Sequence, residues 1–208
     1  MAEKAVPATG RGRGRPRAYD PCIALQRARD AFWKAGYAGT SLEDLVAATS
    51  MNRPSLRAAF GDKREIYLRT LKAYWDFKSA AMREAVEGQD LENALMRVYE
   101  MSLDTYFSGE GSARGCFVVG TAVTEAAEDP DIRRIVSEGF RMLDESFASQ
   151  LRAARANGEL ACGGDPDALA LLASATLHSM AVRARAGASR EELRALARKA
   201  VGVICGTR

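Results

Sequence analysis

The chain has 208 residues, of which 47% are hydrophobic and 27% charged, so it is long and apolar enough to bury a sizeable core. No stretch approaches the roughly 18 uninterrupted apolar residues of a membrane span, and the N-terminal segment lacks the apolar region of a signal peptide. We therefore expect a cytoplasmic protein with no membrane partner. Strand signals are weak and the few prolines cluster where helices would begin, which is typical of an all-α fold.

The net charge of +3 is unevenly distributed along the chain. Residues 1–64 carry 12 Lys and Arg against 6 Asp and Glu, whereas residues 65–208 carry 18 against 21. The first part therefore has a charge of +6 and the second a charge of −3. Because attraction to phosphates depends on clustered positive charge, this distribution favours a polyanionic partner for the N-terminal part.

Residues 1–18 have almost no large apolar side chains, and Arg alternates with Gly within them. Such a segment cannot bury enough apolar surface to fold alone, so we expect a disordered basic arm. Its Arg13, Arg15 and Arg17 resemble the core of an AT-hook, in which an extended segment places Arg side chains in the minor groove of A·T-rich DNA. A generic solubilising tail is the other interpretation.

The segment after the arm predicts three short helices. Asp20 can cap the first helix, with a proline at its first position, and Gly36 ends it. Ser41 and Asp44 have the spacing of a capping box, which predicts the start of a second helix of only two turns.

Asn52 can cap the third helix, which carries Pro54 in its first turn. At roughly 100° per residue, Leu56 belongs to an apolar face, while Arg53 and Arg57 lie on the adjoining face. Packing the apolar face inward leaves these arginines outward, where Arg can bond bidentately to O6 and N7 of guanine in a major groove. The pattern predicts a helix-turn-helix, although a helical hairpin with a solvated charged face would have the same spacing.

From Arg15 to Tyr74 the chain resembles the tetracycline repressor (TetR) family, in the segments GRPRAYD, ALQRARDAFWKAGYAGTS and DLVAATSMNRPSLRAAFGDK. The resemblance implies an all-α fold of about nine helices. It also implies a three-helix, helix-turn-helix DNA-binding domain at residues 19–64, followed by a helical ligand-binding and dimerisation domain at residues 65–208.

The resemblance assigns roles to single residues. Ser41 and Lys63 match positions at which the starts of helices contact phosphates, and Arg53, Pro54 and Ser55 match positions that face bases. Including the arm, the predicted DNA-binding residues are Arg13, Arg15, Arg17, Ser41, Asn52, Arg53, Pro54, Ser55, Arg57 and Lys63.

Two residues depart from the family pattern. Ser50 stands where the family usually has the glycine of the turn, so the turn is expected to be less tightly specified. Arg57 stands where a Tyr is usual, which replaces a stacking, phosphate-bonding ring with a cation. Arg57 is therefore either a guanine-reading residue or a phosphate contact.

Six further helices are predicted in the remaining chain, at residues 62–87, 90–107, 115–129, 130–157, 165–187 and 189–204. The third of these, in GCFVVGTAVTEAAEDPDIR, is mostly uncharged and resembles a subset of TetR-family ligand domains. It is expected to be buried on most sides, in the centre of a bundle that holds a pocket.

Aromatic side chains in residues 65–208, here called the body, are candidates for the wall of such a pocket, although most such residues form core. Thr121, Glu125 and His178 could supply polar contacts, and one carboxylate in an apolar cavity would suit an apolar or cationic molecule. The predicted pocket residues are Trp75, Tyr99, Tyr106, Phe117, Thr121, Glu125, Phe140 and His178.

In the family, the last two helices form a four-helix bundle with a second subunit. Apolar stripes in residues 165–205 agree with such a homodimer, but they could equally form core within one chain. A two-fold pair of recognition helices would read a palindromic operator in double-stranded DNA.

No catalytic motif is recognisable. The chain has no P-loop, dinucleotide-binding fingerprint or GxSxG, and its cysteines lack the spacing of a zinc site. We therefore expect neither an enzyme nor a bound metal or cofactor. Cys116, at the start of a predicted helix, could be a reactive thiol that senses oxidants, or a small residue packed at that position.

The leading hypothesis is a dimeric, sequence-specific transcriptional repressor that a small-molecule effector releases from DNA. An architectural minor-groove protein that binds through its Arg-Gly arm, and a thiol-based sensor that acts through Cys116, are the alternatives.

Overall fold

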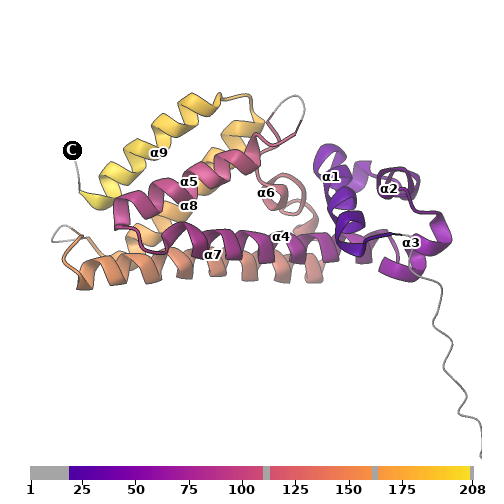
Figure 1. The fold of residues 1–208 in the computed structure, drawn as a ribbon, viewed down its shortest axis with the longest axis horizontal. Coiled ribbons are helices and arrows are strands. Elements are labelled where there is room, and N and C mark those ends of the chain that lie inside the picture. Colours follow the sequence, from indigo (N-terminus) through magenta and orange to yellow (C-terminus); the bar gives the residue numbers. More distant parts are fainter. Residues whose placement is uncertain (1–18, 110–112, 161–163, 207–208) are drawn as a thin grey trace, which may run out of the picture.

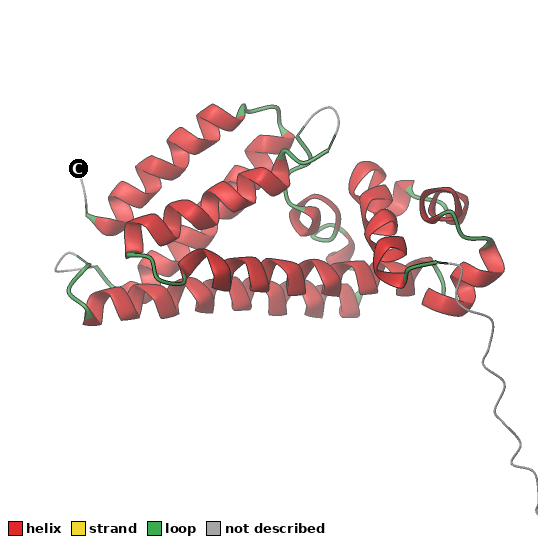
Figure 2. Cartoon of the chain, viewed as in Figure 1, coloured by secondary structure: helices red, strands yellow, loops and turns green. Residues whose placement is uncertain are grey.

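Nine α-helices and one short 3-10 helix form the part of the chain that the computed structural model describes, residues 19–109, 113–160 and 164–206 (Figure 1). These ranges contain no strand (Figure 2), which confirms the predicted all-α fold. The predicted basic arm and its three arginines lie outside the described residues. The elements are α1 (Pro21–Gly39), α2 (Leu42–Thr49), α3 (Arg53–Phe60), α4 (Lys63–Val86), α5 (Leu91–Tyr106), α6 (Phe117–Thr121), η1 (Glu125–Ala127), α7 (Pro130–Ala156), α8 (Pro166–Arg185) and α9 (Arg190–Cys205).

Side chains that accept backbone N–H groups begin each of the three helices of the head, α1 to α3. Asp20 accepts two N–H groups of the first turn of α1, at 2.8 and 3.3 Å. Ser41 and Asp44 form the predicted capping box of α2, and Asn52 accepts the N–H of Ser55 at 2.8 Å at the start of α3. Because these caps satisfy N–H groups that have no partner inside the helix, they set where the helices begin.

The prediction that Gly36 ends the first helix is wrong, since Gly36 interrupts α1, which continues to Gly39. Its φ of 77° and ψ of 171° fall in a region that side chains disfavour, and the carbonyl of Gly36 accepts the hydroxyl of Thr40 at 2.7 Å. The break turns the chain so that the ring of Tyr37 lies 4.8 Å from the ring of Tyr67 on α4.

The core of the head includes the first turns of α4. Phe32, Leu45 and Leu56 from the three head helices are fully buried, and so are Ile66 and Tyr67 of α4. The rings of Phe32 and Tyr67 meet edge to face, with centroids 4.9 Å apart. The helix that enters the body is therefore also a wall of the head.

In the body, α4 and α7 lie side by side, α5 packs on α4 and α8 packs on α7, and α9 packs on the outer side of α5 and α8 (Figure 1). Gly139 of α7 allows a close approach of α4, because a Cβ at this position would lie 1.9 Å from Cε2 of Trp75. The absence of a side chain at Gly139 thus fixes how α7 packs on α4.

The predicted sixth helix over residues 115–129 is wrong in its length. The structure has α6 over only five residues, followed by a turn and by η1. The segment Phe117–Thr124 contains five β-branched residues and one glycine, all poor helix formers. Beyond Ala122 the segment is not buried either, since Val123 is 46% exposed.

An aromatic cluster joins the head to the body. The buried ring of Phe117, at the start of α6, lies 5.5 Å from Trp33 of α1. It also lies 6.0 Å from Tyr67 and 5.6 Å from Tyr74, both on α4. Phe117 therefore packs simultaneously against the first helix of the head and the helix that leaves the head.

Two arginines add polar contacts between head and body. The guanidinium of Arg114 lies 4.4 Å from the ring of Trp33 and 3.1 Å from Asp30, both on α1. Arg64 of α4 donates to Asp129 at 2.6 and 2.9 Å and to Asp131 at 2.7 Å. Hydrogen bonds from this guanidinium lower the pKa of Asp129 to about 2.

Candidate nucleic-acid interface and effector site

The exposed face of α3 carries the predicted base-reading residues. Arg53, Pro54 and Arg57 are exposed, whereas Leu56 and Phe60 face the core. This is the orientation that the helical spacing predicted. In Figure 1, α3 lies at the end of the head that is remote from the body. A groove of DNA could therefore approach α3 without meeting the body.

The two arginines of α3 differ in their surroundings. Arg53 forms an ion pair with Glu43 of α2 at 3.3 Å, and both side chains are well exposed. Arg57 forms no ion pair with any described residue. Since an exposed pair of this kind is worth little, a phosphate or a guanine could displace Glu43 from Arg53 at small cost.

The turn between α2 and α3 is left-handed at Ser50, with φ 57° and ψ 26°. Ser50 is the one non-glycine residue with positive φ among the described residues. The turn therefore keeps the conformation for which glycine is best suited, at a cost of roughly 1 kcal/mol relative to glycine. The expectation that Ser50 leaves the turn less tightly specified stays a prediction.

The two predicted phosphate-contacting residues lie at helix starts. The Ser41 hydroxyl is part of the α2 capping box, in which it donates to Asp44 at 2.7 Å. At the start of α4, the ammonium of Lys63 lies 4.5 Å from the centre of the Tyr37 ring. This cation–π contact holds the ammonium close to the head, beside N–H groups that favour an anion.

Family models match most of the described fold. A model described as bacterial regulatory proteins, tetR family, matches residues 24–70, and one described as tetracyclin repressor-like, C-terminal domain, matches residues 92–200. The chain belongs to the TetR family. It is 32% identical to the HTH-type transcriptional repressor ComR of Escherichia coli (strain K12) over 200 residues, which cover 95% of this chain and 94% of ComR.

Solved structures agree with this assignment. The chain is 32% identical to a cysteine mutant of the TetR family transcriptional regulator CifR, in complex with a 26-bp double-strand operator DNA. The TM-score is 0.80, and the match covers 90% of this chain and 98% of CifR. E. coli NemR in its reduced form has the same fold, with a TM-score of 0.77 at 20% identity over 89% of this chain and 96% of NemR. This TetR-family protein is thus a DNA-binding transcriptional regulator.

The predicted pocket residues of the TetR-family body form two groups. The first group is buried core whose hydroxyls bond within the protein: Tyr99 donates to the carbonyl of Ala173 at 3.1 Å, and Thr121 bonds Tyr67 at 2.8 Å. Tyr106 and Phe117 are also fully buried. These side chains fill the bundle.

The second group lies around α7. The ring of Phe140 lies 6.1 Å from Trp75 and 4.6 Å from His178. Neither Trp75 Nε1 nor His178 Nε2 has a hydrogen-bond partner within the described part of the chain, and burial lowers the pKa of His178. Glu125 lies apart from them, half-buried in η1.

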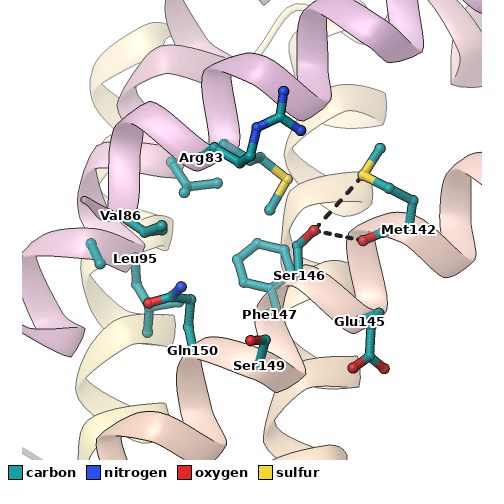
Figure 3. A pocket seen from close by; sticks show the side chains of 12 residues that line it. Arg83, Val86, Leu95, Met142, Glu145, Ser146, Phe147, Ser149 and Gln150 are labelled. Atoms are coloured by element: carbon teal, nitrogen blue, oxygen red, sulfur yellow. Dashed lines mark hydrogen bonds between the residues drawn. The ribbon is translucent and has the colours of Figure 1, made fainter.

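An apolar pocket of about 400 Å³ lies elsewhere, between α4, α5 and α7 (Figure 3). None of the eight predicted pocket residues lines it. Its walls are formed by Met82, Arg83, Val86, Ala94, Leu95, Val98, Met142, Glu145, Ser146, Phe147, Ser149 and Gln150. Several of these belong to the apolar stripes of their helices, but periodicity alone does not reveal which stripes enclose a space.

Cys116 is 8% exposed, and its sulfur accepts the hydroxyl of Tyr74 at 3.4 Å. Among the described residues, no group of three His, Cys, Asp or Glu side chains could hold a metal ion. No helix within the described ranges is long and apolar enough to cross a membrane.

Proposed function

We propose that this TetR-family regulator binds a palindromic operator as a homodimer, and that a small molecule in the body changes its affinity for DNA. The exposed arginine face of α3, with the starts of α2 and α4 beside it, carries this proposal. Arg53, Pro54, Ser55 and Arg57 would face the groove, while Ser41 and Lys63 would contact phosphates. Asn52 would act through its cap, which sets the start of α3. We propose a cytoplasmic repressor without catalytic activity.

The outer surface of α8 and α9 supports a dimer through residues 165–205. Seven large apolar side chains are exposed among the described residues, and four of them lie on these two helices. Leu171 is 59% exposed, Val182 56% and Val203 68%, and Leu172 accompanies them. Burying these side chains against a second subunit would remove apolar surface from water.

One helix connects the proposed effector pocket with the proposed DNA surface. Lys63 lies at the first residue of α4, and Met82, Arg83 and Val86 in its last turns line the pocket. The 24 residues of α4 span about 36 Å. An effector that binds more tightly to one position of α4 would therefore shift Lys63 and the head packed on α4.

Replacing Arg53 by alanine should lower the preference for the correct base at one operator position by about 1–3 kcal/mol, because a bidentate contact is lost. Lys63→Ala should instead weaken binding to all DNA and reduce the salt slope by about one unit. Fluorescence anisotropy with an operator selected from random DNA, and with single-base variants of it, measures both effects. Arg155→Ala, an exposed arginine far from the head, is the control. Unchanged base preference in Arg53→Ala would contradict the role of α3.

Deleting residues 1–17 should reduce affinity for all sequences severalfold while leaving base preference intact, because the arm contributes positive charge. The same anisotropy assay measures this. Complete loss of binding to the palindromic site would instead identify the arm as the principal DNA-binding element, as an architectural minor-groove protein requires.

A further inference from the structure

Lys78 of α4 is a buried amine in the core of the body. It is 6% exposed, and its Nζ donates to the hydroxyl of Ser102 on α5 at 2.9 Å. That hydroxyl donates in turn to the carbonyl of Val98 at 2.8 Å. An ammonium has three N–H donors, so this one hydrogen bond leaves most of its capacity unused.

The surroundings of Lys78 do not compensate its charge. No carboxylate of the described residues forms an ion pair with it, and its helical neighbours one turn away, Tyr74 and Met82, are themselves buried. Burial lowers the pKa of Lys78 for this reason. Burying an amine beside a single hydroxyl costs free energy of folding, so this arrangement is not explained by stability.

The position of Lys78 relates it to the apolar pocket. Met82 of α4 and Val98 of α5 belong to the pocket wall, and each lies four residues from one member of the Lys78 and Ser102 pair. Lys78 and Ser102 therefore lie roughly 6 Å further along the same two helices. Met82, one turn from Lys78 on α4 and part of the pocket wall, has a flexible side chain that can change rotamer without moving the backbone.

The pocket itself offers few other partners for a charged group. Ser146 donates its hydroxyl to the carbonyl of Met142 at 2.7 Å (Figure 3). Arg83 donates to Ser79 at 2.8 Å, and Glu145 on the α7 wall is paired with Arg152 at 3.0 Å. The remaining wall is largely aliphatic. The volume of the pocket is near the lower end of the range for ligand pockets, roughly 300–1,000 Å³.

We propose that the effector is a small apolar carboxylate, whose chain occupies the pocket between α4, α5 and α7 and whose carboxylate pairs with Lys78 and Ser102. The proposal deepens the proposed function and rests on it, since it names the class of effector for the body. The carboxylate supplies the negative partner that the Lys78 ammonium lacks. The pair is shielded from water, and charge-assisted hydrogen bonds are strong in such a water-excluded site.

The pairing also gives a reason for a response in DNA binding. Lys78 lies on α4 and Ser102 lies on α5. The affinity for a carboxylate bound to both would therefore depend on the relative position of the two helices. Since α4 begins at Lys63, a shift of α4 would reach the head.

A series of ligands with one chain and different head groups tests the proposal. Octanoate, octanol and octylamine are compared by isothermal titration calorimetry and by their effect on operator binding in fluorescence anisotropy. We expect octanoate to bind and to change operator affinity, with octanol and octylamine at least about thirtyfold weaker. Lys78→Met, whose side chain fills a similar volume, should bind octanoate more weakly by the same factor. Lys72 is exposed on the same helix, and Lys72→Met should bind octanoate with unchanged affinity.

Two controls keep the outcomes distinct. Lys78→Met should unfold at a temperature at least as high as the unchanged protein, because an apolar side chain replaces an uncompensated amine. Its operator binding without ligand should be unchanged, so loss of only the octanoate response supports the proposal. Failure of the unchanged protein to bind the operator would instead refute the proposed function.

Three results would overturn the proposal. One is octanoate binding no tighter than octanol, which would reduce the site to an apolar pocket. Another is unchanged octanoate binding in Lys78→Met. The third is a reducible adduct of octanal with Lys78, trapped by cyanoborohydride and located by mass spectrometry, with no response to octanoate, which would assign Lys78 to carbonyl chemistry.

Discussion

Phe117→Ala is expected to lower the free energy of unfolding by about 3–5 kcal/mol, the largest effect of any single substitution considered for this protein. The ring is fully buried and lies within 6.0 Å of three other aromatic rings, on α1 and α4. Removing it leaves a cavity at the contact between head and body, which cannot collapse without moving α1. Urea denaturation followed by circular dichroism measures the loss.

The same substitution should reduce operator affinity under conditions in which the variant is still folded, because α1 and α4 lose their common contact. Val119→Ala is the control and should cost much less, because Val119 lies two residues further along the same short helix and is only half-buried. Equal losses for the two variants would show that α6 contributes only general apolar burial.

Gly139→Ala is expected to destabilise the protein by about 1–3 kcal/mol, although glycine-to-alanine changes inside helices normally stabilise by about 1 kcal/mol. The reversal follows from the Trp75 ring, whose Cε2 would lie 1.9 Å from the new methyl group. Either the indole or the α4–α7 spacing must change.

Gly39→Ala is the matched control for this reversal. Gly39 is also helical, but a Cβ there would lie 3.7 Å from its nearest contact, an ordinary van der Waals distance. The midpoint temperature of thermal unfolding should therefore fall in Gly139→Ala and rise in Gly39→Ala. A gain in stability for Gly139→Ala would mean that α4 and α7 can separate freely, and would weaken the case for α4 as a rigid connection.

The helices of the head could be predicted from local chemistry. Asp20, Ser41 and Asn52 each satisfy N–H groups within three residues of themselves, so the sequence signal and the structural cause are the same contact. The outward orientation of Arg53 and Arg57 follows from helical spacing once Leu56 is placed inside. Neither inference required knowledge of distant parts of the chain.

The proposed effector site could not be predicted in the same way. The aromatic residues proposed for it, such as Tyr99 and Tyr106, fill the core, because large rings bury area wherever helices converge. The cavity depends instead on how three helices splay near Met82 and Val98, which only tertiary packing determines. Lys78 did carry a local signal, since it is a lone cation between Tyr74 and Met82 on one apolar face.

The ion pairs of Arg64 with Asp129 and Asp131 have a consequence for any measurement of DNA affinity against salt. Arg64 immediately follows Lys63, and its side chain is 41% exposed, so dissolved ions weaken its hold on α7. The same ions compete with Lys63 for a phosphate. Ionic strength therefore has two effects: it weakens the contacts with the operator, and it weakens the ion pairs between α4 and α7. The number of phosphate contacts calculated from the salt dependence of DNA binding will therefore be too high, because part of that dependence comes from the ion pairs of Arg64.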